Sequence, residues 1–195
     1  ARLQRTLDAV YTIVFGSEDD ALATAAAVRA VHDRVQGPGY QANDPSLLLW
    51  VHATLVDTAL RVHARFLGPL RPDDADEYYE ESKTIAELLG VPAGAQPGGL
   101  ADFRAYVRDM VGSLQVSEQA RDLARTVLHP PVPWPASPLV ALGRELTVGL
   151  LPPPVRRGFG FTWDARRQAA LAAASLSARQ VLSRTPAAIR RVRVA

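Results

Sequence analysis

Apolar residues recur at helical spacing through most of this chain, whereas the alternation of apolar and polar residues that marks a half-buried strand is scarce. Since a helix buries every third or fourth residue and a strand every second one, this pattern predicts an all-α fold. The 195 residues, 48% of them hydrophobic, suffice for a substantial core. We therefore expect one helical domain over residues 1–195, built as a bundle of about seven to nine helices.

Glycine, proline and capping residues divide the pattern into helical segments. Gly16 ends the first segment, and Ser17 with the acidic residues after it is typical of a helix N-terminus. Asn43 or Asp44 can cap a long apolar helix that has Pro45 at its first position. The proline-rich stretch 130–138 predicts a rigid crossover, and the stretch 152–161 a loop. The expected helices cover residues 3–15, 18–37, 45–66, 72–90, 100–114, 117–128, 139–150 and 164–183, and an arginine-bearing tail follows.

Composition excludes several kinds of chemistry. The chain has no cysteine, which rules out disulfides, thiolate zinc sites, iron–sulfur clusters and a cysteine nucleophile within it. Lys83 is the sole lysine and lies in a charged helix without a glycine-rich loop, so neither a Schiff base nor a P-loop is expected. The net charge is only +2 and no basic helix carries interleaved aromatics, so we expect no nucleic-acid partner.

The termini and the apolar stretches of the sequence bear on where in the cell the protein is located. No run approaches the roughly 18 apolar residues of a membrane span, and no signal peptide is found, so we expect a cytoplasmic protein without a span. The chain lacks an initial methionine and begins within a helical pattern, so we expect an upstream segment to be missing from it. The oligomeric state is left open, with a homodimer as one alternative.

Two histidines, His52 and His63, fall in the long apolar helix. At about 100° per residue they share a face but lie about 16 Å apart along the axis, so they cannot bind one metal ion. His52 follows the apolar run "LLLWV" and is either a hydrogen-bonded core histidine or a ligand, because a single helix-borne histidine in an apolar cavity can hold haem iron. His63, between Arg61 and Arg65, is expected to be a surface or capping residue.

Arg29 and His32 lie three residues apart and therefore share a face of the preceding helix. The pair can donate hydrogen bonds to an anion, a cofactor carboxylate or bound dioxygen. The alternative is an exposed polar stripe near the helix end.

Several phrases, in this order, carry a resemblance to a known family: "RTLDAVYTIVFGS", "VRAVHDRVQG", "GYQANDPSLLLWVHATLVDT", "YYEESKTIAELLGVP" and "LLPPPVRRGFGFTW". The chain resembles the bacterial family that includes latex clearing protein and MpaB-type oxygenases, and an uncharacterised branch of it rather than the rubber-cleaving enzyme. The resemblance covers nearly all residues and is most specific in Y-x-A-x-D-P-x-L-L-x-W-V-H.

The resemblance implies an all-helical fold and a haem b group that activates dioxygen to cleave a hydrophobic substrate. It matches His52 to the axial iron ligand and Arg29 to an arginine near the haem, while His32 falls where the rubber oxygenase carries a lysine. We expect Arg29 and His32 to be catalytic. His52, Arg29, Val51, Leu55 and Val56 are expected to bind the haem, with His52 as the metal ligand.

The resemblance has two departures. The lysine–threonine pair expected after the arginine is His32–Asp33, and the acidic residue proposed as a base in the rubber enzyme has no clear counterpart. We therefore expect a hydrophobic small-molecule substrate, as the resemblance implies, and leave its identity open. One alternative is a non-catalytic helical protein that binds a lipophilic molecule or a protein partner. Another is a metal-dependent enzyme that uses His32, His52 and a carboxylate.

Overall fold

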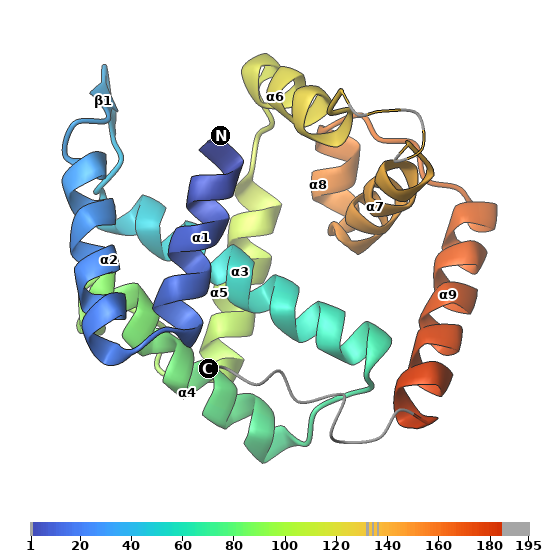
Figure 1. The fold of residues 1–195 in the computed structure, drawn as a ribbon, viewed down its shortest axis with the longest axis horizontal. Helices are drawn as coiled ribbons and strands as arrows, with labels where there is room; N and C mark the ends of the chain where they lie inside the picture. Colours follow the sequence, from blue (N-terminus) through green and yellow to red (C-terminus); the bar gives the residue numbers. More distant parts are fainter. Residues whose placement is uncertain (1, 132, 134, 136, 185–195) are drawn as a thin grey trace. The chain divides into compact units, whose positions relative to one another are not determined.

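The computed structural model describes residues 2–131, 133, 135 and 137–184, and it is almost entirely helical (Figure 1). Over these residues it has nine α-helices, one short 3-10 helix and one hairpin, which confirms the all-α prediction and the expected helix number. In chain order the elements are α1 (Arg2–Phe15), α2 (Glu18–His32), β1 (Gln36–Gly37), β2 (Tyr40–Gln41), α3 (Pro45–Phe66), α4 (Pro72–Leu88), η1 (Ala93–Ala95), α5 (Leu100–Ser113), α6 (Glu118–Leu128), α7 (Ser137–Leu150), α8 (Pro153–Gly158) and α9 (Ala165–Arg184).

Side-chain caps fix where three helices begin. The Ser17 hydroxyl accepts a hydrogen bond from the Asp20 amide at 3.2 Å at the start of α2, and Ser117 makes the same contact with the Ala120 amide before α6. The choice between Asn43 and Asp44 at α3 falls to Asp44, whose carboxylate accepts from the Ser46 amide at 2.8 Å. The hydrogen bond from the Ser46 hydroxyl, and then those from the Ser46 and Leu47 amides, lower the pKa of Asp44. The caps satisfy amide groups that have no partner within the helix.

Of the described residues, 2–60 and 70–106 form a first compact unit. Helix α1 packs against α2, and α2 contacts α4 (Figure 1). Tyr79 of α4 and Phe103 of α5 are each 2% exposed, with ring centroids 4.8 Å apart. The Tyr79 hydroxyl donates to the Pro97 carbonyl at 2.8 Å, so the polar end of this buried ring is satisfied.

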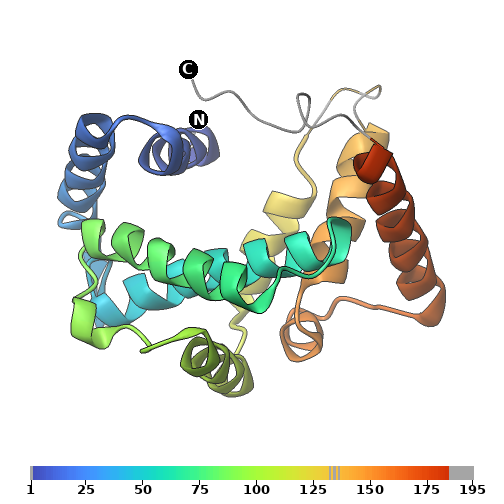
Figure 2. The same cartoon turned by 90° about the horizontal axis from the view of Figure 1, so that it is seen from below.

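A smaller cluster in the first unit lies beside the predicted site. Leu49 of α3 packs with Ala86 of α4 and with Val91, and half-buried Leu48 and Tyr106 adjoin them. Figure 2 shows α4 running alongside the first part of α3. The cluster therefore fixes which face of α3 is turned into the protein.

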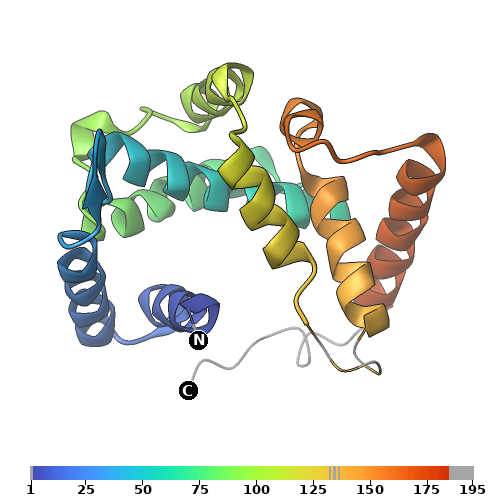
Figure 3. The same cartoon turned by 90° about the horizontal axis from the view of Figure 1, so that it is seen from above.

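The second compact unit comprises residues 61–69 and 107–184 of the described chain. It contains α6 to α9, and α7 packs against α9 (Figure 3). Arg121 of α6 donates from Nε to the Gly158 carbonyl at the end of α8, at 3.0 Å. Leu171 and Val148 are its buried apolar residues on α9 and α7.

The structure corrects the predicted end of the second helix. It ends at His32 rather than Gly37, because the chain turns and β1 then pairs antiparallel with β2. Pro38 disfavours helical backbone in the residue before it, and Gly39 has a φ of +70°, a conformation that glycine adopts at little cost. A turn and the first strand of the hairpin therefore occupy residues 33–37, which periodicity assigned to a helix.

A second correction concerns the predicted loop 152–161, which contains the short helix α8. Proline at the first helical position needs no amide hydrogen bond, so the run of prolines begins this helix instead of preventing it. Residues 132, 134 and 136 of the predicted crossover and the tail 185–195 lie outside the described residues. The extent of the domain over 1–195 stays a prediction.

Candidate functional site

His52 lies on the buried face of α3. Leu49, Ala53 and Val56 share this face and are 9%, 0% and 3% exposed, which is the spacing expected of one helical stripe. His52 itself is 6% exposed, and its Nε2 has no hydrogen-bond partner among the described residues. A buried polar atom without a partner carries a desolvation cost, so it marks a place where a partner is missing. A hydrogen-bonded core histidine would have this nitrogen paired with a protein group. No such hydrogen bond is made to Nε2 by the described residues.

The protonation state of His52 follows from the same burial. Removal from water disfavours the charged imidazolium and lowers the pKa of His52. The ring is therefore neutral near neutral pH. A neutral imidazole nitrogen without a competing hydrogen bond is the form that binds a metal.

The remaining predicted wall residues divide between two faces of α3. Val56 is buried beside His52, whereas Val51 is 58% exposed and Leu55 is 52% exposed. Val51 and Leu55 are four residues apart and therefore form a separate apolar stripe on the helix surface. Of the predicted set, only Val56 shares the buried face with His52.

Arg29 and His32 lie near the end of α2. Gly90 locates the Arg29 side chain, because a Cβ at that position would lie 3.7 Å from both Arg29 Cδ and Leu48 Cδ1. Leu48 is one turn before His52 on α3. The stem of the exposed Arg29 thus lies near the N-terminal part of the helix that carries His52. His32 is half-buried, and its Nδ1 also lacks a partner among the described residues.

Asn43 is a residue of this region that the sequence did not assign to it. Its amide nitrogen donates to the Arg29 carbonyl at 3.1 Å and to the Asp33 carboxylate at 2.6 Å, which ties the end of α2 to the start of α3. The only signal in the sequence was its place beside the capping residue Asp44, and that signal favoured a role in the cap.

His63 has the structural role that the sequence predicted. Its Nδ1 lies 2.9 Å from the Gly68 carbonyl, which accepts the ring N–H, and the Gly68 amide donates to the His63 carbonyl at 3.0 Å. Gly68 has a φ of +111°, the left-handed backbone that commonly ends a helix. The interpretation of His63 as a capping residue is confirmed.

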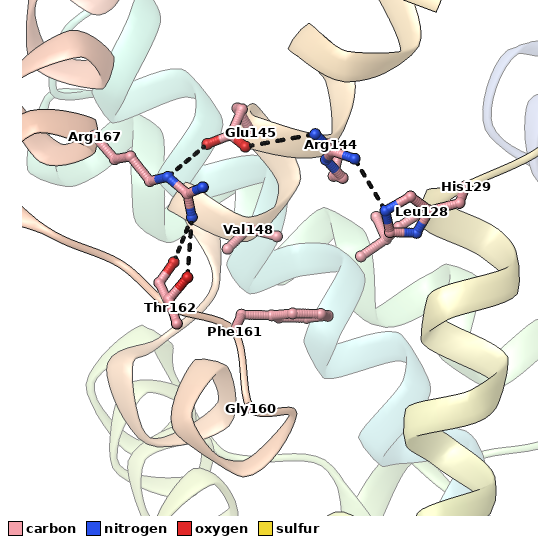
Figure 4. Close-up of a pocket in the computed structure, with 9 residues that line it drawn as sticks. All are labelled: Leu128, His129, Arg144, Glu145, Val148, Gly160, Phe161, Thr162 and Arg167. Carbon is pink, nitrogen blue, oxygen red and sulfur yellow. Dashed lines mark hydrogen bonds and ion pairs between the residues drawn. The ribbon is translucent and has the colours of Figure 1, made fainter.

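The second unit contains a pocket of about 200 Å³ that sequence reasoning did not find (Figure 4). Glu145 lies between two guanidinium groups, with Arg167 Nε at 3.5 Å and Arg144 Nη2 at 3.9 Å. Arg167 also donates to the Thr162 carbonyl at 2.7 Å. The charged groups of this pocket therefore satisfy one another.

His129 is held within the same network. Arg144 Nη1 lies 2.9 Å from His129 Nε2, and since a guanidinium can only donate, Nε2 must be the acceptor. The proton then resides on Nδ1, which lies 3.0 Å from the Arg125 carbonyl. Both ring nitrogens are occupied, in contrast to Nε2 of His52. His129 therefore has no ring nitrogen left to act as a base or to bind a metal.

A second cavity of the same unit, about 480 Å³, is lined by four arginines and by no carboxylate. Within the described ranges no group of three or more histidine, aspartate and glutamate side chains could hold a metal ion. The alternative of a metal site built from His32, His52 and a carboxylate thus gains no support there. No helix of the described chain is long and apolar enough to cross a membrane.

The fold and His52 together define a class of protein: an all-helical chain with a neutral core imidazole that has one nitrogen free. Comparison with protein families narrows this class. Residues 1–180 match the model of the family described as ER-bound oxygenase mpaB/B'/Rubber oxygenase, catalytic domain. The chain belongs to this family of oxygenase catalytic domains, which confirms the resemblance found in the sequence.

Two mycobacterial proteins are also similar to the chain. An uncharacterized protein of Mycobacterium tuberculosis and one of Mycobacterium bovis are each 31% identical to it over 175 residues. The alignments cover 86% of this chain and 68% of each relative. This similarity fits the expected uncharacterised branch of the family. No solved structure matches the chain.

Proposed function

We propose that the protein is a haem b-dependent oxygenase-like oxidoreductase that acts on a hydrophobic small molecule. His52 is the residue that would hold the iron. The observation that carries this proposal is the buried Nε2 of His52, which has no hydrogen-bond partner among the described residues. The membership in a family of oxygenase catalytic domains supports the reaction class.

The residues around His52 fit a haem group in their chemistry. Leu49, Ala53 and Val56 make the surroundings of His52 apolar, and burial keeps the imidazole neutral and able to bind metal. When bound, haem supplies an iron centre that can react with dioxygen. A single protein ligand suffices for haem, so this fit does not depend on a cluster of ligands.

Arg29 and His32 are the polar residues proposed to act beside His52. Arg29 is a permanent cation that would hold a haem propionate or another anionic group beside it. His32 Nδ1 is buried and has no partner in the part of the chain that the structure describes, so this ring can hold or donate a proton at that atom. The protein would thus supply a metal ligand, a fixed positive charge and a proton-carrying group.

The test is a haem measurement on full-length protein. We expect a Soret band and a positive pyridine haemochrome assay from protein produced with haem available, and loss or shift of the band in His52→Ala. His63→Ala is the matched control, since it removes a histidine of the same helix that only caps the helix end. The proposal would be wrong if full-length wild-type protein never takes up haem, or if the Soret band is unchanged in His52→Ala.

The exposed stripe of α3 favours a second candidate function. Leu47, Val51 and Leu55 follow one another at four-residue spacing and are 39%, 58% and 52% exposed. Such a stripe suits a helical protein that binds a lipophilic molecule without redox chemistry. Extraction of co-purified lipid from haem-free protein that consumes no oxygen would favour this function over the first.

A further inference from the structure

The arginine cavity of the second unit, about 480 Å³ in volume, has an unusual balance of charge. Four arginines line it, Arg61, Arg65, Arg156 and Arg179, and neither aspartate nor glutamate is among its lining residues. The pocket of Figure 4 is different, because there the Glu145 carboxylate pairs with Arg144 and Arg167. Arg61 has an interaction partner of its own, so the positive charge that the cavity offers to an anion comes from Arg65, Arg156 and Arg179.

Arg156 is the most buried of the four arginines that line this cavity. It is only 9% exposed, and its guanidinium lies over the Trp163 ring, with Cζ 4.8 Å from the ring centroid. Its Nη1 is fully buried and has no hydrogen-bond acceptor among the described residues. A buried guanidinium normally pairs with a carboxylate or phosphate, because the loss of water must be compensated. The acceptor that Arg156 needs is therefore missing from the described chain.

Arg179 is held in position by the end of α3. Its Nε donates to the Arg65 carbonyl at 2.9 Å and its Nη2 to the Ala64 carbonyl at 2.5 Å. These contacts fix the plane of the guanidinium at the cavity and leave Nη1 as a further donor. A fixed guanidinium loses little side-chain freedom when an anion binds.

We propose that the arginine cavity binds the phosphate group of an organic phosphomonoester. A phosphate dianion offers three terminal oxygens, enough to accept hydrogen bonds from more than one guanidinium. The volume exceeds that of a phosphate alone and lies in the range of small-molecule sites. Leu150 and Leu151 line the remaining wall and would contact the organic part of the ligand. The phosphomonoester is either a soluble compound or the headgroup of phosphatidic acid.

Titration calorimetry with the full-length protein tests this site. The soluble probes are inorganic phosphate and glycerol 3-phosphate, and the lipid probes are phosphatidylcholine vesicles with and without phosphatidic acid. We expect saturable binding of one phosphate per chain. Stronger binding of glycerol 3-phosphate than of inorganic phosphate would assign the soluble source. Binding only to the vesicles that contain phosphatidic acid would assign the lipid source.

Three substitutions distinguish phosphate binding in the cavity from non-specific attraction to positive charge. Arg156→Met and Arg65→Gln should each weaken binding at least about tenfold. Arg157→Gln is the matched control, because this neighbour of Arg156 is exposed, does not line the cavity and removes the same charge. If Arg156→Met fails to fold by circular dichroism, Arg65→Gln decides the outcome.

Two results would overturn the proposal. One is the absence of saturable binding to all the phosphate probes. The other is an equal loss of binding in Arg157→Gln and Arg65→Gln, which would show only screening of surface charge. Neither result depends on haem, so the outcome is separate from that of the proposed oxygenase function.

Discussion

The side-chain amide of Asn43 donates a hydrogen bond to the backbone carbonyl of Arg29 at 3.1 Å, across the junction between α2 and α3. The same nitrogen donates to the Asp33 carboxylate at 2.6 Å. These contacts join the two helices that carry the residues proposed to bind haem. The Arg29 carbonyl also accepts the Asp33 amide at the helix end, so the junction is fixed by several bonds together.

Asn43→Ala removes both side-chain hydrogen bonds of this junction. We expect a loss of about 1–2 kcal/mol in the free energy of unfolding, since one of the acceptors is charged. Asn43→Asp should be more harmful, because its carboxylate cannot donate and would face the Asp33 carboxylate. Urea unfolding at neutral pH measures both. An Asn43→Asp variant as stable as wild type would show that the junction does not depend on this donor.

His52→Leu should separate haem binding from stability. In haem-free protein we expect the variant to be at least as stable as wild type at pH 7, because leucine of similar size removes the unpaired Nε2. Its stability advantage should grow as the pH falls below about 6.5, where the unfolded imidazole takes up a proton that the folded one resists. Urea unfolding of both proteins from about pH 5 to 8 checks this, because that range spans the ordinary histidine pKa.

The control for this prediction is His52→Ala, which leaves a cavity and should destabilise haem-free protein at every pH. A stability difference between wild type and His52→Leu that does not vary with pH would contradict the burial of a neutral imidazole.

The burial of the Tyr79 phenol predicts that the protein loses stability at alkaline pH. Burial, and then the nearby charges of Glu80 and Asp102, raise the pKa of Tyr79 to about 12. The unfolded phenol ionises near pH 10, so wild type should lose stability between about pH 10 and 12, by at most about 1.4 kcal/mol per pH unit from this residue. Tyr79→Phe should be less stable at pH 7, because it loses the hydrogen bond to Pro97. Its deficit should shrink above pH 10, and a constant deficit would exclude the buried neutral phenol.

Gly149 tests the packing of α7 against α9. A Cβ at this position would lie 2.6 Å from both Leu171 Cδ2 and the Trp163 ring, so Gly149→Ala should cost about 1–3 kcal/mol of stability. Gly143 is the matched control on the same helix, because a Cβ there meets nothing within 4 Å. Gly143→Ala should add about 0.5–1 kcal/mol by improving helix propensity. Thermal unfolding compares the two, and a gain in both would mean that α7 and α9 do not pack closely.

The sequence predicted local structure best where one residue type has one physical role. Ser17 and Ser117 cap the helices that they precede, and Pro45 begins α3. The helix prediction failed at residues 33–37, because the hairpin depends on pairing between Gln36 and Gln41 rather than on periodicity. It also failed at α8, since prolines that end one helix can begin another.

The sequence by itself determined that the chain is helical, that His52 lies in an apolar helix and that His52 and His63 cannot act as a pair. These conclusions need only the helical period and the residue types. Only the tertiary structure decided that His63 caps a helix end, and that neither His52 Nε2 nor the buried Arg156 Nη1 has a hydrogen-bond partner among the described residues. The reason is physical: a hydrogen-bond partner can come from any part of the chain, and its identity is fixed when helices pack.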